Sequence, residues 1–217
     1  DKRIKETYRK YSETTLNKAF NQILLDSEKQ SRRIISNLPD GTYKAKDYID
    51  GDGNVKNQIS VQIKIQIKGS NILFDYTGCS QARKAPINCS LGALTSAVKT
   101  VFKALVEPFA PSNEGYFKPM KIIIPKNTIF SAEKPSPTGW YYEGVSQASE
   151  LAWKALAPLA PNRFSAGTYM SLCATYICGN NVNNQYVHIE PQHGGWGATL
   201  NRDGANALIA ITDGDTY

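Results

Sequence analysis

The sequence contains only two histidines, His188 and His193, among 217 residues. A metal centre built mainly from histidine therefore cannot be assembled within this chain, although either residue could contribute one ligand. No Gly-x-x-x-x-Gly-Lys-Ser/Thr, Gly-x-Gly-x-x-Gly or Gly-x-Ser-x-Gly motif is present. These absences exclude the common phosphate-binding loop and nucleophile turn, so we expect any ATP chemistry to be housed in another polypeptide.

Long apolar runs are also missing. No run approaches the ~18 residues that a membrane-spanning helix needs, and nothing near the N-terminus has the pattern of a signal peptide. The four cysteines (Cys79, Cys89, Cys173 and Cys178) lie among apolar or small residues without a Cys-x-x-Cys pair. This pattern predicts buried free thiols and is typical of a reducing cytoplasm. We therefore expect a cytoplasmic protein that does not enter a membrane.

The net charge of +6 is concentrated near the N-terminus, where nine basic residues and five acidic residues fall within the first 36 positions. A basic, solvated helix face explains this excess without a polyanion, so we expect no nucleic-acid partner. The chain begins without Met and ends directly after a strand-like run. We expect a segment truncated at both ends, with a helical part over residues 1–37 and an α+β part over residues 38–217.

Hydrophobic periodicity predicts the secondary structure. Residues 2–37 form a long amphipathic helix, with a potential break near Asp26 and Ser27, and Pro39-Asp40-Gly41 ends it. Alternating apolar residues predict antiparallel strands, and further periodic runs predict a helix capped by Asn88 or Ser90, a short strand and a second helix. In order, these elements cover residues 42–49, 59–68, 72–76, 91–106, 121–124 and 143–156, and apolar runs follow at 169–177, 186–189 and 207–211. The fold class is α+β, with a mixed, mainly antiparallel sheet and packed helices.

An acidic turn has part of the pattern of a calcium site. Asp50, Asp52 and Asn54 match the first three ligand positions of an EF-hand loop. Val55 and Val61, however, occupy the places of the required glycine and glutamate, so a hairpin turn is favoured. We predict no metal site within this chain.

The segment least like ordinary core is His193-Gly194-Gly195-Trp196-Gly197. Clustered glycines expose backbone N–H groups and suit an anion-binding concavity. His193 could move a proton and Trp196 could form a pocket wall. The alternative is an irregular turn packed under a tryptophan. Asp203, in the following Arg-Asp-Gly turn, is a second candidate catalytic residue or part of a turn ion pair.

Two other polar or aromatic segments could face a substrate. Asp75 and Asn88 lie in a loop region between a predicted strand and a predicted helix, where they could orient a substrate or serve as caps. Tyr141 belongs to an aromatic cluster at the start of a helix, which could be a ligand-facing wall or a core edge. Together with Gly194, Gly195 and Trp196, these residues are the predicted substrate-binding set.

A series of short motifs, taken in order, resembles the hydantoinase B/5-oxoprolinase family. The motifs occupy residues 38–43, 50–53, 74–78, 86–88, 113–115, 124–125, 194–197 and 202–204. The aromatic variant at residues 139–143 is similar to members called N-methylhydantoinase B and to subunits of acetone and acetophenone carboxylases.

The resemblance implies part of a subunit that works with a hydantoinase A-type ATP-binding subunit. The implied reaction is ATP-dependent opening of a cyclic amide such as a hydantoin or 5-oxoproline. The alternatives are ATP-dependent carboxylation of a ketone and a mainly structural region that docks subunits. The resemblance also implies that ATP and magnesium are held by the partner, that a divalent metal lies in the upstream half of the subunit, and that this segment alone is inactive.

Overall fold

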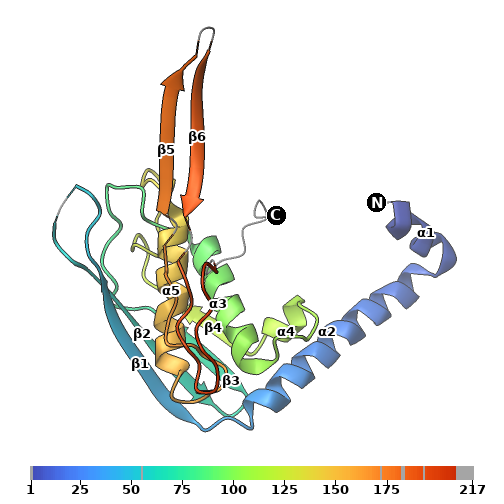
Figure 1. Cartoon of the computed structure of the whole chain (residues 1–217). Helices are drawn as coiled ribbons and strands as arrows, with labels where there is room; N and C mark the ends of the chain where they lie inside the picture. Colours follow the sequence, from blue (N-terminus) through green and yellow to red (C-terminus); the bar gives the residue numbers. More distant parts are fainter. Residues whose placement is uncertain (1, 55, 172, 182–183, 193, 209–217) are drawn as a thin grey trace.

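The computed structural model describes residues 2–54, 56–171, 173–181, 184–192 and 194–208. Its body is a β-sheet covered on one face by two helices, α3 (Leu91–Val106) and α5 (Tyr141–Leu156) (Figure 1). Two structures project from this body: a helical arm at the N-terminus and a β-hairpin near the C-terminus. The predicted α+β class, with a mainly antiparallel sheet and packed helices, is confirmed.

The sheet has four strands in the order β1-β2-β3-β4. Strands β1 (Gly41–Ile49), β2 (Ile59–Lys68) and β3 (Asn71–Asp75) are antiparallel, and β4 (Met120–Ile123) is parallel to β3. Strict alternation in β2 buries the side chains of Ile59, Val61, Ile63, Ile65 and Ile67. The opposite face of the sheet carries lysines and amides and faces solvent.

Helices α3 and α5 close the core against the apolar face of the sheet. The hydroxyl of Ser90 accepts a hydrogen bond from the Ala93 amide and caps α3 at the predicted position. The phenol of Tyr76 donates to the carbonyl of Ala148 in α5, so the buried ring is packed and its polar atom is paired. Sheet and helices thus share one hydrophobic core.

The N-terminal segment contains two helices, α1 (Lys2–Lys10) and α2 (Glu13–Ile35). The predicted break near Asp26 and Ser27 is wrong, because the chain breaks at Tyr11 and Ser12. Ser12 caps α2 by accepting from the Thr15 amide at 3.2 Å. Asp26 and Ser27 stay helical because Gln22 and Asn113, respectively, bind their side chains. The predicted division of the chain at residue 37 stays a prediction.

The second half of α2 packs against the short helix α4 (Glu114–Phe117). Gly115 permits this contact, because a Cβ atom there would overlap the backbone of Leu24. Tyr116 and Phe117 of α4 stack on Phe102 of α3, with ring centroids 5.8 Å apart in each pair. This junction fixes α2 to the body.

The two apolar runs near residues 169–189 become a hairpin of β5 (Cys173–Asn180) and β6 (Gln185–Gln192). Its pairs Tyr176–Ile189 and Cys178–Val187 place apolar side chains on one face, and all four are exposed. Of the predicted apolar run at 207–211, residues 209–211 lie outside the described residues. No helix in the described part of the chain has the length and apolarity to cross a membrane.

The cysteine prediction is confirmed in part. Cys79 and Cys89 are buried free thiols, whereas Cys178 is free but exposed, so the expectation of burial is wrong there. Cys178 lies on the exposed apolar face of the hairpin, where its neighbours across the strands are also exposed. The side chain of Cys173 lies outside the described residues.

We expect iodoacetamide to modify Cys178 rapidly in the native chain and Cys79 and Cys89 only after unfolding. Burial raises the pKa of Cys79 to about 11 and that of Cys89 to about 12, which keeps the reactive thiolate scarce. Peptide mass spectrometry measures each site, and Cys178→Ser is the control. Rapid modification of Cys79 or Cys89 in the native chain would contradict their burial.

Candidate functional site

A pocket of about 330 Å³ lies between α3, α5 and the glycine-rich segment, and we call it the α3–α5 pocket. Small polar residues, one carboxylate and two tryptophans line it: Ser96, Thr100, Ser146, Ser149, Glu150, Trp153, Thr168 and Trp196. The hydroxyls of Ser96, Thr100 and Ser149 donate to carbonyls of their own helices. Their oxygens therefore keep lone pairs that can accept a hydrogen bond from a bound ligand.

Glu150 is the titratable group of this pocket. The Thr168 hydroxyl donates to its Oε1 at 2.5 Å and thereby fixes the carboxyl against α5. Burial raises the pKa of Glu150 above its ordinary value of 4.5, and the nearby charge of Asp47 acts in the same direction. A carboxyl with a raised pKa beside a pocket is suited to exchanging a proton with a ligand.

Trp153 and Trp196 form the aromatic wall. Their rings meet edge to face at 83°, with centroids 5.7 Å apart. The indole N–H of Trp153 donates to the Ser165 carbonyl at 3.2 Å, which fixes that ring. The prediction that Trp196 faces a pocket agrees with its position, although its role in binding stays a prediction.

The glycines around Trp196 allow chain segments to pack closely. A Cβ atom on Gly195 would lie 2.7 Å from the Ala205 carbonyl oxygen, and one on Gly194 or Gly204 would overlap Tyr169 or Trp196. The amides of Trp196 and Gly197 donate to the carbonyls of Ala205 and Gly167 at 2.8 and 2.7 Å. These two N–H groups are therefore used internally, as expected for the packed turn rather than for an anion-binding concavity.

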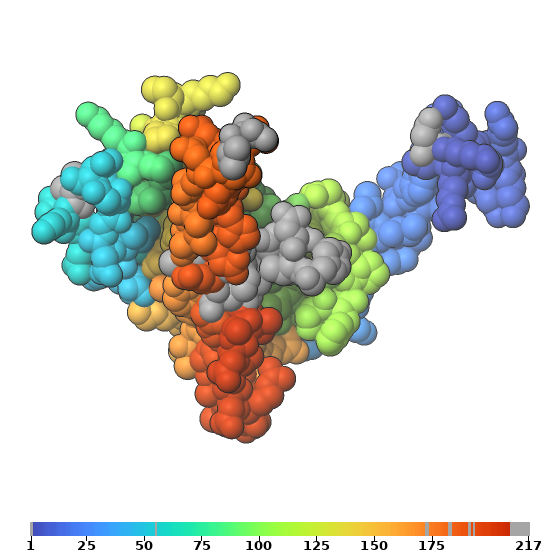
Figure 2. Space-filling view, turned by 45° about the horizontal axis from the view of Figure 1, so that its top comes forward, coloured from blue at the N-terminus to red at the C-terminus, as the bar shows by residue number. Residues whose placement is uncertain are grey.

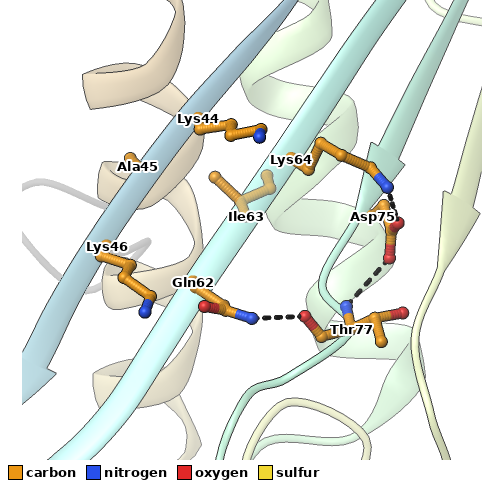
Figure 3. Close-up of a pocket in the computed structure, with 8 residues that line it drawn as sticks. All are labelled: Lys44, Ala45, Lys46, Gln62, Ile63, Lys64, Asp75 and Thr77. Atoms are coloured by element: carbon orange, nitrogen blue, oxygen red, sulfur yellow. Dashed lines mark hydrogen bonds and ion pairs between the residues drawn. The ribbon is translucent and has the colours of Figure 1, made fainter.

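Asp75 lies elsewhere, in a hollow of about 580 Å³ on the outer face of the sheet (Figure 3). Lys64 and the Thr77 amide each donate to its carboxylate at 2.9 Å. Burial alone would raise the pKa of Asp75, but these hydrogen bonds outweigh it and hold the pKa below its usual value. Because Lys64 is directly opposite Lys44 in the sheet, Asp75 offsets a like-charge pair.

Asn88 is fully buried beneath the loop that precedes α3. Its amide oxygen accepts from the Arg83 amide at 2.7 Å. Its NH₂ group lies 2.8–3.0 Å from the carbonyls of Arg83, Ala85 and Pro137. In this structure Asn88 holds the loop together and presents no polar group to a ligand.

The remaining predicted residues are dispersed. Tyr141 begins α5, is half exposed and contacts Tyr142, which stacks on Trp140 with centroids 4.8 Å apart. Asp203 is exposed beyond a tight turn. His193 lies outside the described residues. The structure thus gathers Gly194, Gly195 and Trp196 near the α3–α5 pocket but does not bring Asp75, Asn88 or Tyr141 to it.

The sequence analysis missed Glu150, Trp153 and Thr168. A signal was available in α5, where Glu143, Gln147 and Glu150 recur at helical spacing among buried residues. Among the described residues, no three His, Cys, Asp or Glu side chains come together in a way that could hold a metal ion. The expected metal in an upstream part of the subunit stays a prediction.

Comparison with known proteins covers the whole sequence. The model of the family described as hydantoinase B/oxoprolinase matches residues 1–217. The B-type subunit named "Putative D-/L-hydantoinase" in Pseudomonas sp. (strain NS671) is 29% identical over 95% of this chain and 36% of its own length. An uncharacterized protein of Methanocaldococcus jannaschii is 29% identical over 82% of this chain and 31% of its own length. The chain spans about a third of these relatives.

Two solved structures share the fold. The ATP-dependent caprolactamase of Pseudomonas jessenii matches 94% of this chain and 36% of its own, with a TM-score of 0.77 and 18% identity. Nucleotide-free acetone carboxylase matches 97% of this chain and 31% of its own, with a TM-score of 0.75 and 16% identity. With the family model matched from the first residue to the last, the chain belongs to the hydantoinase B/oxoprolinase family.

Proposed function

We propose that the chain is part of the B-type component of an ATP-dependent hydrolase that opens small cyclic amides together with an A-type ATP-binding subunit. The observation that carries this proposal is the 29% identity, over 95% of the chain, to a relative whose name gives it as the B-type component of a hydantoinase. The structural neighbour named as a caprolactamase acts on another cyclic amide by its name. Hydantoins and lactams share a ring amide, so the proposed substrate class is defined by that group.

The α3–α5 pocket offers groups that suit this substrate class. Its volume of about 330 Å³ accommodates a five- to seven-membered ring, and the Trp153–Trp196 wall offers apolar contact. The hydroxyl oxygens of Ser96, Thr100 and Ser149 can accept a hydrogen bond from the ring N–H. Protonated Glu150 can donate to the substrate and hand its proton to the ring nitrogen as the C–N bond breaks.

The described residues fit neither ATP nor a metal, so no step is routed through either group here. ATP and magnesium are assigned to the partner subunit, and a divalent metal to an upstream part of the subunit. His193 and Asp203 remain candidate catalytic residues of the complete enzyme.

We expect the complete two-subunit complex to open hydantoin, 5-oxoproline or caprolactam only when ATP is supplied. Chromatography of the ring-opened product and a coupled ADP assay measure the two yields, which should rise together. The 217-residue chain alone is the control and should be inactive. Opening of any of these rings by that chain without ATP would contradict the proposal.

A second candidate function is ATP-dependent carboxylation of a ketone. The fold shared with acetone carboxylase and the aromatic residues Trp140, Tyr141 and Tyr142 favour it. Labelled bicarbonate supplied with acetone or acetophenone separates the two candidates. Label fixed in a ketone-derived acid, without ring opening of any cyclic amide, would overturn the hydrolase proposal.

A further inference from the structure

The N-terminal helices form an arm that stands clear of the body (Figure 2). We define the arm as residues 2–23, which comprise α1 and the first half of α2. Within it, Leu16 is the only buried residue, and α1 has none. A nine-residue helix without tertiary packing is marginal in water, so the arm requires a surface to pack against.

The arm carries an exposed apolar stripe. Ile4, Tyr8 and Tyr11 follow one another at helical spacing in and just after α1, and Phe20 and Ile23 continue the apolar surface on α2. Their side chains are 43–61% exposed. Several large apolar residues exposed on one element mark an interaction surface rather than ordinary solvent contact.

The charge of the arm restricts what can cover it. Helix α1 contains five basic residues (Lys2, Arg3, Lys5, Arg9 and Lys10), whereas Glu6 is its only acidic residue. The stripe is therefore flanked by cations along the helix. A complementary surface has an apolar floor and an acidic rim.

We propose that the arm packs into an apolar, acid-rimmed groove formed by the part of its own subunit that lies outside these 217 residues. The proposal rests on the assignment of the chain to a B-type subunit. The relatives are about three times as long as the matched region, so the same polypeptide can supply such a groove. An unpacked α1 and a half-packed α2 are then consequences of viewing one part of a larger core.

Other occupants fit the arm less well. A second copy of the chain carries the same net charge of +6 and the same basic arm, so like charges oppose that pairing. An anionic membrane would accept the charge, but the stripe includes two tyrosines on or next to a helix of only nine residues. Tyrosine and arginine are enriched at protein interfaces, which favours a protein groove.

Amide hydrogen exchange tests the proposal. In the 217-residue chain we expect the amides of α1 to exchange nearly as fast as in an unfolded peptide. In the full-length subunit, without the ATP-binding partner, their exchange should slow at least about 100-fold. In the full-length subunit, the double substitution Ile4→Ser and Tyr8→Ser should abolish this protection and lower the Tm. The same substitutions should leave the Tm of the 217-residue chain unchanged, because both side chains are exposed there. Glu6→Ser, on the opposite face of α1, is the matched control and should keep the protection.

Three outcomes would overturn the proposal. Protection that arises only when the ATP-binding subunit is added would assign the arm to the subunit interface. Protection of the 217-residue chain that grows with its concentration would assign the arm to a second copy. Protection that requires phosphatidylglycerol vesicles would assign it to a membrane surface. None of these measurements needs catalysis, so a protected arm in a complex that opens no cyclic amide would reject the proposed function alone.

Discussion

Replacing Glu150 by glutamine is expected to lower the turnover of the complete two-subunit enzyme by about 10²–10⁴-fold, the usual contribution of a general acid or base. Glutamine keeps the shape of the side chain and can still accept the Thr168 hydrogen bond, but it cannot exchange a proton with the substrate. The substrate KM should change much less than kcat, because the Trp153–Trp196 wall and the hydroxyls of the pocket are retained. Steady-state kinetics with saturating ATP measures both constants.

The matched control is Glu133→Gln, which removes an exposed carboxylate whose ion pair with Lys126 is long, at 3.7 Å. It should leave turnover unchanged. If Glu150→Gln is also fully active, Glu150 takes no part in proton transfer, and a mainly structural role for this region gains support.

The pH dependence of stability gives a second readout of Glu150 that needs no activity. Its pKa in the folded chain is raised above the ordinary value of 4.5, with burial as the main cause. Its contribution to stability is therefore complete below the unfolded pKa and is lost as pH rises through the folded pKa. Glutamine stays neutral, so the Glu150→Gln variant should gain stability relative to the wild type over that rise in pH. Urea unfolding of the 217-residue chain across this range measures the difference.

Replacing Asn88 by alanine is expected to lower the free energy of unfolding by about 3 kcal/mol, because it strands several buried backbone groups at once. The substitution removes the acceptor for the Arg83 amide and the donors to the carbonyls of Arg83, Ala85 and Pro137. No water can replace the lost amide without opening the loop, since Asn88 is fully buried. Urea unfolding of the 217-residue chain measures the loss.

Asn37→Ala serves as the control, since Asn37 is exposed and should change stability by no more than about 0.5 kcal/mol. A loss below about 1 kcal/mol for Asn88→Ala would show that the loop does not depend on this network. The interpretation of Asn88 as a substrate-orienting residue would then regain weight.

Local pattern was sufficient for most of the body. The isoleucine alternation predicts β2 over residues 59–68, and the cap at Ser90 helps to predict α3 over residues 91–106, the bounds that the structure has. The parallel pairing of β4 with β3 could not be predicted, because it depends on the intervening helices folding first onto the sheet. The break in the N-terminal helix was misplaced because Asp26 and Ser27 are stabilised by contacts that the pattern does not show.

The candidate site was less predictable than the fold. Trp196 stands out in sequence because three glycines surround it, and it does line the α3–α5 pocket. Glu150 becomes notable only through Thr168, which is 18 residues away and reaches it across the chain reversal after α5. Asp75 and Asn88 have the residue types of a binding site, but Lys64 and three backbone carbonyls satisfy them. Residue type alone does not show whether a polar group is already paired.

The β5–β6 hairpin also bears on how this chain behaves in concentrated solution. Among the described residues no further strand pairs with it, so both of its long edges offer N–H and C=O groups to another strand. Its first strand begins Cys-Ala-Thr-Tyr-Ile-Cys, six uncharged residues without proline or glycine. Such a segment on an open edge is a template for intermolecular β-stacking. The hairpin is therefore where aggregation of the separated chain would nucleate, and a chaperone that holds this chain would be expected to shield that ribbon first.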